Sequence, residues 1–120
     1  MNTKILYAED EEQTRSLVAE ELRQEGYTVD TAEDGEAAIG LLAGRSYDLL
    51  LLDIRMPKKS GLDLLSFVRE QNRHPRIIML TAVDDLASAV QAVKLGANDY
   101  LTKPFRLEQL LSAIERILHR

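Results

Sequence analysis

The chain has 120 residues and a formal net charge of −5, and its composition is 45% hydrophobic and 29% charged with no cysteine. These values are typical of a globular domain and exclude a disordered chain, while the lack of cysteine excludes disulfide frameworks, thiolate metal sites and cysteine nucleophiles. The negative charge opposes nucleic-acid binding, because that affinity rests largely on neutralising phosphates. No segment has the pattern of a secretion signal or a membrane span, so we expect a single cytoplasmic domain over residues 1–120 that contacts neither nucleic acid nor membrane.

Short apolar segments alternate along the chain with segments of helical periodicity. The apolar segments have the length of strands, and the periodic segments place apolar side chains three and four residues apart. The expected strands cover residues 5–8, 27–31, 47–52, 77–80 and 98–101. A helix is expected after each strand, bounded by polar caps, glycines or turns: Asp10 and Gly26, Asp34 and Gly44, Ser60, Asp84 and Gly96, and the Lys103-Pro104-Phe105 turn.

Two of the expected helices have clear apolar stripes. In the fourth helix, Leu86, Ala89, Val90 and Val93 fall at three- and four-residue offsets, which is the spacing of a core-facing stripe. The last helix has a longer stripe of leucine and isoleucine within residues 107–118, which we also assign to the core.

The alternation of five strands with five helices predicts an α/β three-layer sandwich, a parallel sheet with helices on both faces. The first, third and fourth strands are continuously apolar, as strands buried on both faces are, whereas the second and fifth are mixed. Placing the mixed strands at the edges gives the order 2-1-3-4-5 with right-handed crossovers. This is the doubly wound arrangement of flavodoxin-like folds.

Charged and hydroxyl side chains follow the ends of four of these strands. Glu9 and Asp10 come after the first strand, Asp53 closes the leucine run of the third, and Thr81 and Lys103 follow the fourth and fifth. Because ligands bind outside the carboxyl ends of the strands in such sheets, we expect these side chains to share one site.

The chemistry of this set points to a metal and a phosphate. Three clustered carboxylates repel one another unless a cation lies nearby. Mg²⁺ fits, because it binds oxygen ligands, commonly one or two carboxylates with waters and a phosphate oxygen. Lys103 and the Thr81 hydroxyl would complete a site for a tetrahedral anion. An aspartate is also a nucleophile in phosphoryl transfer, where it forms an acyl phosphate, and Asp53 is the central candidate.

The whole chain strongly resembles the receiver domain of two-component response regulators. Each matching motif lies at its own strand end, and the set is highly specific although each motif alone is common. The motifs are Glu9-Asp10, Asp53-x-x-Met56-Pro57 with Gly61, Thr81-Ala82, and Lys103-Pro104-Phe105 preceded by Tyr100.

The resemblance implies that Asp53 accepts a phosphoryl group from the phosphohistidine of a sensor histidine kinase. Asp10, Asp53 and the backbone carbonyl of Arg55 would hold Mg²⁺, and Glu9 would act mainly through a metal-bound water. Lys103 would pair with a phosphoryl oxygen. The domain would catalyse only its own phosphoryl transfer and dephosphorylation, with no separate substrate turnover.

The resemblance also implies a switch. Phosphorylation adds about −1.5 to −2 charges, which would draw the Thr81 hydroxyl inward, and Tyr100 would fill the space vacated. The surface of the fourth helix, fifth strand and fifth helix would then change to control an output domain or effector protein, with transcription as the expected output. A phosphorylation-dependent homodimer is a further expected partner. The Lys103-Pro104 peptide bond is expected to be cis, as in the family.

Some residues depart from the commonest pattern of the family. Glu9 stands where many relatives have aspartate, and Arg106 stands where many have a helix cap, which weakens the expected start of the last helix. Arg55 and Val83 occupy positions that tune phosphate lifetime in the family. A bulky cation at Arg55 would shield the phosphate from water.

Three other functions stay open at this point. A Mg²⁺-dependent phosphatase with an aspartyl nucleophile typically has a second acid where this chain has Arg55. A flavin or nucleotide carrier needs an anion cradle where this chain has four acids at residues 9–12. A degenerate receiver that acts only as an interaction module would not need Asp53, Thr81 and Lys103 together. The chain is expected to be either a free-standing receiver or the N-terminal part of a longer transcription factor.

Overall fold

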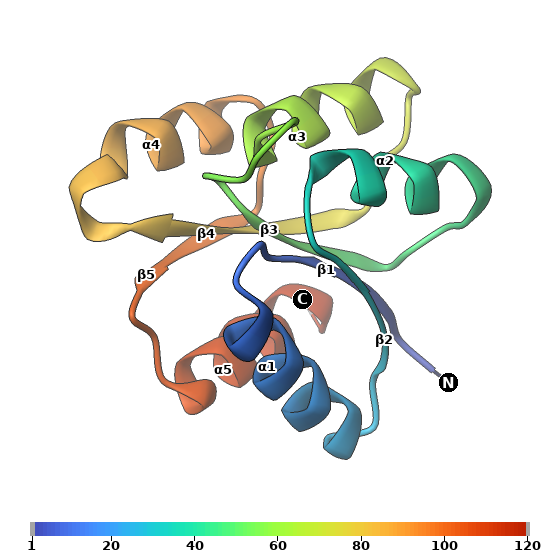
Figure 1. Cartoon of the computed structure of the whole chain (residues 1–120), viewed down its shortest axis with the longest axis vertical. Coiled ribbons are helices and arrows are strands. Elements are labelled where there is room, and N and C mark those ends of the chain that lie inside the picture. Colours follow the sequence, from blue (N-terminus) through green and yellow to red (C-terminus); the bar gives the residue numbers. More distant parts are fainter. Residues whose placement is uncertain (1, 120) are drawn as a thin grey trace.

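A computed structural model describes residues 2–119. These residues form a five-stranded parallel sheet of order β2-β1-β3-β4-β5, which confirms the expected topology (Figure 1). Each expected strand overlaps an observed one, with ends that differ by at most two residues. The strands are β1 (Lys4–Ala8), β2 (Thr28–Ala32), β3 (Leu49–Asp53), β4 (Arg76–Ala82) and β5 (Asp99–Lys103).

The burial of the strands follows from their composition. Every residue of β3 is buried, β1 is buried after its first residue, and β4 is buried between its two end residues, because helices cover both faces of the central strands. The edge strands β2 and β5 are partly exposed, in keeping with their mixed sequences. The parallel register sets Asp53 beside Leu80 of β4, so neighbouring strands end at the same rim.

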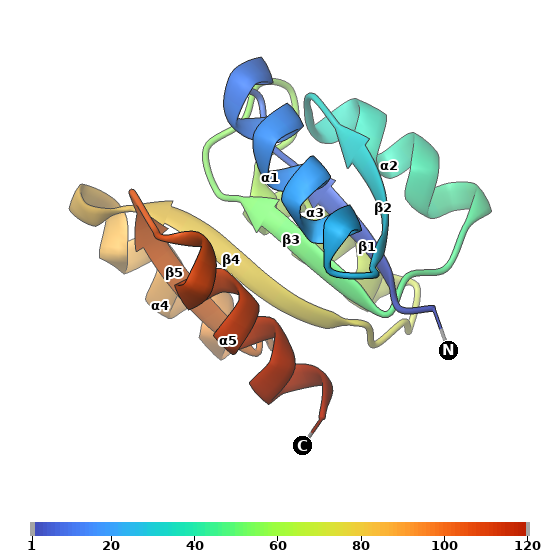
Figure 2. The same ribbon diagram turned by 90° about the horizontal axis from the view of Figure 1, so that it is seen from below.

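The helices form two layers. Figures 1 and 2 show α1 and α5 on one face of the sheet and α2, α3 and α4 on the other. Two separate apolar cores result, one on each face of the sheet. The helices are α1 (Glu12–Gln24), α2 (Gly35–Gly44), α3 (Gly61–Glu70), α4 (Leu86–Lys94) and α5 (Leu107–Leu118). Among residues 2–119, no helix is both long enough and apolar enough to cross a lipid bilayer.

Two of the expected caps are wrong. The side chain of Glu11, not Asp10, accepts the Thr14 backbone N–H at the start of α1, because the helix begins one residue later than expected. Asp84 lies in a short 3₁₀ turn, η1 (Val83–Asp85), and α4 begins only after it. The expected caps Asp34 and Ser60 are confirmed.

The first turn of α5 is held by a side chain of the helix itself. Arg106 was expected to weaken this start, yet the side chain of Gln109 accepts a hydrogen bond from the Arg106 backbone N–H at 2.8 Å. A donor at the helix N-terminus is thereby satisfied from within the helix.

The apolar stripe of α4 is also placed differently. Its buried residues are Ala89 and Ala92, whereas Leu86, Val90 and Val93 are 43–50% exposed. The helix therefore packs through its small residues, and the larger ones lie on an adjacent stripe that faces outward. This surface includes residues of the predicted output face.

Candidate functional site

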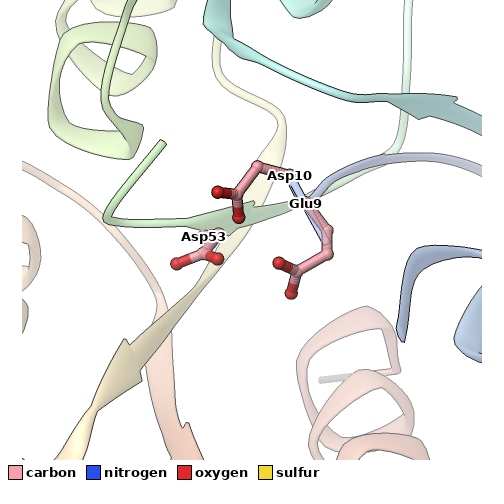
Figure 3. A group of neighbouring side chains, drawn as sticks. All are labelled: Glu9, Asp10 and Asp53. Atoms are coloured by element: carbon pink, nitrogen blue, oxygen red, sulfur yellow. The ribbon is translucent and has the colours of Figure 1, made fainter. Parts of the chain in front are cut away.

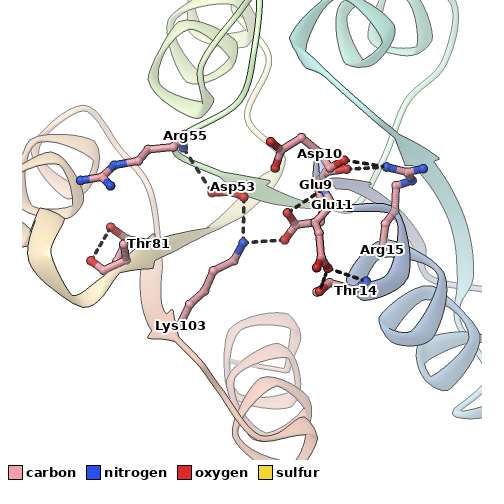
Figure 4. Close-up of polar contacts among 10 residues, drawn as sticks. Glu9, Asp10, Glu11, Thr14, Arg15, Asp53, Arg55, Thr81 and Lys103 are labelled. Atoms are coloured by element: carbon pink, nitrogen blue, oxygen red, sulfur yellow. Dashed lines mark hydrogen bonds and ion pairs between the residues drawn. The ribbon is translucent and has the colours of Figure 1, made fainter.

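The carboxyl ends of four strands bring the expected side chains to one rim. Glu9 and Asp10 follow β1, Asp53 ends β3, Thr81 lies near the end of β4, and Lys103 ends β5. Figure 4 shows the side chains of Glu9, Asp10, Asp53 and Lys103 converging, with Thr81 beside them on β4. Residues far apart in sequence thus meet because parallel strands end together.

Three carboxylates form the centre of the site. Carboxylate oxygens of Glu9, Asp10 and Asp53 lie within 4.8 Å of one another (Figure 3). Glu9 is only 1% exposed and Asp53 5% exposed, whereas Asp10 faces solvent. An all-oxygen set with one open side has the chemistry that Mg²⁺ takes, with water and substrate oxygens filling the remaining positions.

Lys103 offsets part of the negative charge of this cluster. Its Nζ donates to Glu9 Oε1 at 2.6 Å and to Asp53 Oδ2 at 2.8 Å. Burial acts to lower the pKa of Lys103, but the hydrogen bonds to Asp53 and Glu9 outweigh it, so its pKa is raised above the ordinary value. The lysine therefore stays charged over the physiological range.

Further hydrogen bonds hold the Asp53 carboxylate and the main chain of Glu9 and Asp10. The Arg55 backbone N–H donates to Asp53 Oδ1 at 3.2 Å, so both oxygens of that carboxylate have partners. Arg15, on the first turns of α1, donates to the backbone carbonyls of Glu9 at 2.9 Å and Asp10 at 3.4 Å. Arg15 was not singled out from the sequence, although its place one turn after the acidic pair was a usable signal.

Gly61 allows α3 to begin directly against the end of β3. An added Cβ at this glycine would lie 2.7 Å from the Asp53 carbonyl oxygen and 3.0 Å from the Ile54 Cα. Both neighbours are backbone atoms, so they could not yield without moving the strand end. The glycine thus sets the position of Asp53.

The expected switch residues are separate from the carboxylate cluster. Thr81 is 1% exposed, and its hydroxyl can donate to the backbone carbonyl of Asp85 at 3.2 Å or to that of Ala82 at 3.3 Å. Tyr100 is 38% exposed on the edge strand β5. The Lys103–Pro104 peptide bond is cis, the isomer that the resemblance implies.

Two features of the site region were missed. The Arg55 guanidinium reaches over to Asp84 and Asp85 in η1, a pairing that separations of 29 and 30 residues conceal in the sequence. The Tyr7 hydroxyl, on β1 below the site, is buried and has no hydrogen-bond partner among residues 2–119. Burial, with the nearby Glu9 and Asp53 carboxylates, raises the pKa of Tyr7.

The fold and the site together define a flavodoxin-like domain with an acidic, lysine-bridged site at the strand carboxyl ends. The family model described as "Response regulator receiver domain" matches residues 5–115. The chain therefore belongs to the response regulator receiver domain family.

Known proteins of this family match along nearly the whole chain. The Transcriptional regulatory protein CpxR of Escherichia coli (strain K12) is 46% identical over 117 residues, which are 98% of this chain and 50% of CpxR. The chain spans about half the length of the curated relatives it matches.

Solved structures agree with the sequence relatives. The receiver domain of the Francisella response regulator 1452 has a TM-score of 0.91 and 31% identity, covering 99% of this chain and 98% of that one. The response regulator TrrA of Thermotoga maritima, solved with Mg²⁺ and BeF, has a TM-score of 0.85 and 36% identity, covering 97% and 99% of the two chains.

Proposed function

We propose that this chain is a phosphorylation-dependent signalling switch in which Asp53 accepts a phosphoryl group from a sensor histidine kinase. The observation that carries the proposal is the environment of Asp53. Its carboxylate is buried, bound by Lys103, and within 4.8 Å of the Glu9 and Asp10 carboxylates. No such cluster of buried charge is needed to hold a sheet together, since replacing buried ion pairs by apolar residues is often neutral or stabilising.

The transfer itself requires mainly positioning and charge neutralisation. An oxygen of Asp53 forms a bond to phosphorus while the P–N bond of the donor phosphohistidine breaks, and the imidazole leaves with the electron pair. Lys103 is placed to bind a phosphoryl oxygen. Asp10, Asp53 and the Arg55 backbone carbonyl would hold Mg²⁺, with Glu9 acting through water, and the ion would supply further neutralisation of the phosphoryl oxygens. The related response regulator TrrA, which is 36% identical to this chain and was solved with Mg²⁺ and BeF, supports this assignment.

The switch would begin at Thr81. In the unmodified protein its hydroxyl is engaged by the Asp85 carbonyl, and a phosphoryl oxygen on Asp53 would compete for the same proton. Tyr100 would then turn inward from its exposed position, changing the surface of α4, β5 and α5. This is a two-state population shift biased by the added charge.

The α4–β5 surface is suited to pass the signal on. Its exposed apolar side chains are larger than those that α4 buries, and exposed apolar surface of this kind favours protein contacts. We assign it to an output domain, an effector or a phosphorylation-dependent homodimer. Relatives such as CpxR make transcription the expected output, and the cytoplasm the expected location.

Incubation with acetyl phosphate and Mg²⁺, followed by intact-mass measurement, tests the function. We expect the mass of one added phosphoryl group on the wild type and none on Asp53→Asn, because the amide is not a nucleophile for this transfer. Equal addition to both proteins would refute the assignment. Continuous release of phosphate from unrelated monoesters would instead favour an aspartyl phosphatase.

A further inference from the structure

The side chain of Arg55 has a place in this site that its backbone role does not explain. Arg55 follows Asp53 by two residues, and its backbone N–H lies 3.2 Å from Asp53 Oδ1. Its guanidinium is directed away from Asp53 (Figure 4) and contacts the η1 turn. There Nε lies 3.3 Å from Asp85 Oδ2, and Nη2 lies 3.4 Å from Asp84 Oδ1.

Asp85 is held by two residues that flank the site, Arg55 and Thr81. Its carboxylate pairs with Arg55, and its backbone carbonyl accepts the hydrogen bond from Thr81. A third contact, from the Ser88 hydroxyl to Asp85 Oδ1 at 2.8 Å, joins the residue to the first turn of α4. Asp85 therefore links the end of β3, the end of β4 and the start of α4.

We propose that Arg55 is a phosphoryl-binding side chain that Asp84 and Asp85 withhold in the unmodified protein. Phosphorylation of Asp53 would let the guanidinium exchange these two carboxylates for the phosphoryl oxygens. The inference rests on the proposed function, because it presupposes a phosphoryl group on Asp53.

The balance of charge favours this exchange. A phosphoryl group carries about −1.5 to −2 charges, and arginine binds its oxygens in a bidentate, charge-assisted manner. The Arg55 side chain is 59% exposed, and its partners Asp84 and Asp85 are 75% and 20% exposed. Ion pairs with so exposed a partner are weak. The same phosphoryl charge would also repel the Asp84 and Asp85 carboxylates.

The exchange would couple the modification to α4. Thr81 and Arg55 would leave Asp85 in the same event, so η1 would lose its contacts with both residues. Since α4 buries only Ala89 and Ala92, little apolar packing opposes a shift of its first turn.

The test titrates the protein with beryllofluoride, which stands in for the phosphoryl group, in the presence of Mg²⁺. The measured quantity is the apparent affinity of the protein for beryllofluoride. Asp84→Asn with Asp85→Asn should raise that affinity about two- to fivefold, the size that exposed ion pairs supply. In an Arg55→Gln background, which keeps the main chain that would hold Mg²⁺, the same two changes should give little or no gain. Glu12→Gln, which neutralises an exposed carboxylate at the same rim, is the matched control and should leave the affinity unchanged.

The Nε–H signal of Arg55 in a ¹⁵N spectrum, assigned with Arg55→Lys, gives a second readout. The chemical shift of this signal should change when beryllofluoride binds to the wild type. Without beryllofluoride, it should also differ between the wild type and the variant with Asp84→Asn and Asp85→Asn. An unmoved Arg55 signal on binding, or an equal gain in affinity with and without Arg55, would overturn the exchange while leaving phosphorylation of Asp53 intact. Failure of the wild type to bind beryllofluoride at all would overturn both proposals.

Discussion

Lys103 is the single side chain on which the unmodified site depends most. It contacts two carboxylates, Glu9 and Asp53, that are almost fully buried. Lys103→Met would leave them facing each other without a cation, and removing one partner of a buried pair costs about 3–5 kcal/mol. Because 29% of the lysine side chain is exposed, we expect a loss near the lower limit, about 3 kcal/mol, in urea unfolding without divalent ions.

Mg²⁺ should restore part of that loss, because it would neutralise the same carboxylates, and it should stabilise Lys103→Met more than the wild type. Lys94→Met, at an exposed position of α4, is the control and should change little. Equal stabilisation of the wild type and Lys103→Met by Mg²⁺ would count against a shared carboxylate site.

A hydrogen bond between Tyr47 and Asp30, on the edge strand β2, makes the stability of the fold depend on pH in the acid range. The Tyr47 hydroxyl donates to Asp30 Oδ2 at 2.7 Å, and this bond is the main reason that the pKa of Asp30 is lowered, with Arg45 adding to it. A carboxyl whose folded pKa is depressed contributes stability above its unfolded pKa of about 3.9 and loses it as the pH falls through the folded value.

Tyr47→Phe should therefore lower the unfolding free energy by about 1 kcal/mol at neutral pH. Below about pH 4, the unfolding free energy of this variant should decrease less with falling pH than that of the wild type. Burial, and then the bond to Asp30, raise the pKa of Tyr47 to about 12, so its own ionisation does not enter this range. Tyr100→Phe, at an exposed position, is the control. Identical acid-unfolding curves for the two variants would show that the Tyr47–Asp30 bond is not stabilising.

At the scale of elements, the contact between α3 and β3 makes a sharp test of how the site is positioned. Gly61→Ala would press a Cβ against backbone atoms of Asp53 and Ile54, so we expect a loss of about 2 kcal/mol and slower phosphorylation. Gly40→Ala, inside α2 with open space around it, should instead stabilise by about 0.5–1 kcal/mol. Thermal unfolding of the two variants distinguishes them, and shifts of the same sign would contradict the close approach at Gly61.

The pattern of apolar residues in the sequence predicted the strands and helices well. The contacts between these elements were harder to predict. The five strands and their order followed from apolar runs that only a covered sheet can bury. The start of α4 did not, since either Asp84 or Asp85 is an acceptable cap in the sequence, whereas both lie in the η1 turn and pair with Arg55. The outward stripe of α4 has the same spacing as a core stripe, so its direction depends on which face the sheet covers.

At the scale of the whole molecule, parallel strands ending at one rim made the positions of Glu9, Asp10, Asp53 and Lys103 predictable. The arrangement of their charges was not, because whether the lysine or another cation lies between the carboxylates depends on side-chain geometry. The place of Arg15 one turn after the acidic pair indicates a contact, but not that its guanidinium binds the backbone carbonyls of Glu9 and Asp10.

The central claim is that Asp53 is the phosphoacceptor, and locating the modified residue tests it most directly. Borohydride reduces an aspartyl phosphate to homoserine, so the chain phosphorylated with acetyl phosphate and Mg²⁺ can be reduced, digested and sequenced by mass spectrometry. We predict homoserine at position 53 alone, appearing only when both Mg²⁺ and the donor are present. Homoserine at position 10 instead, or an unreduced phosphate on a hydroxyl side chain such as Thr81, would contradict the account.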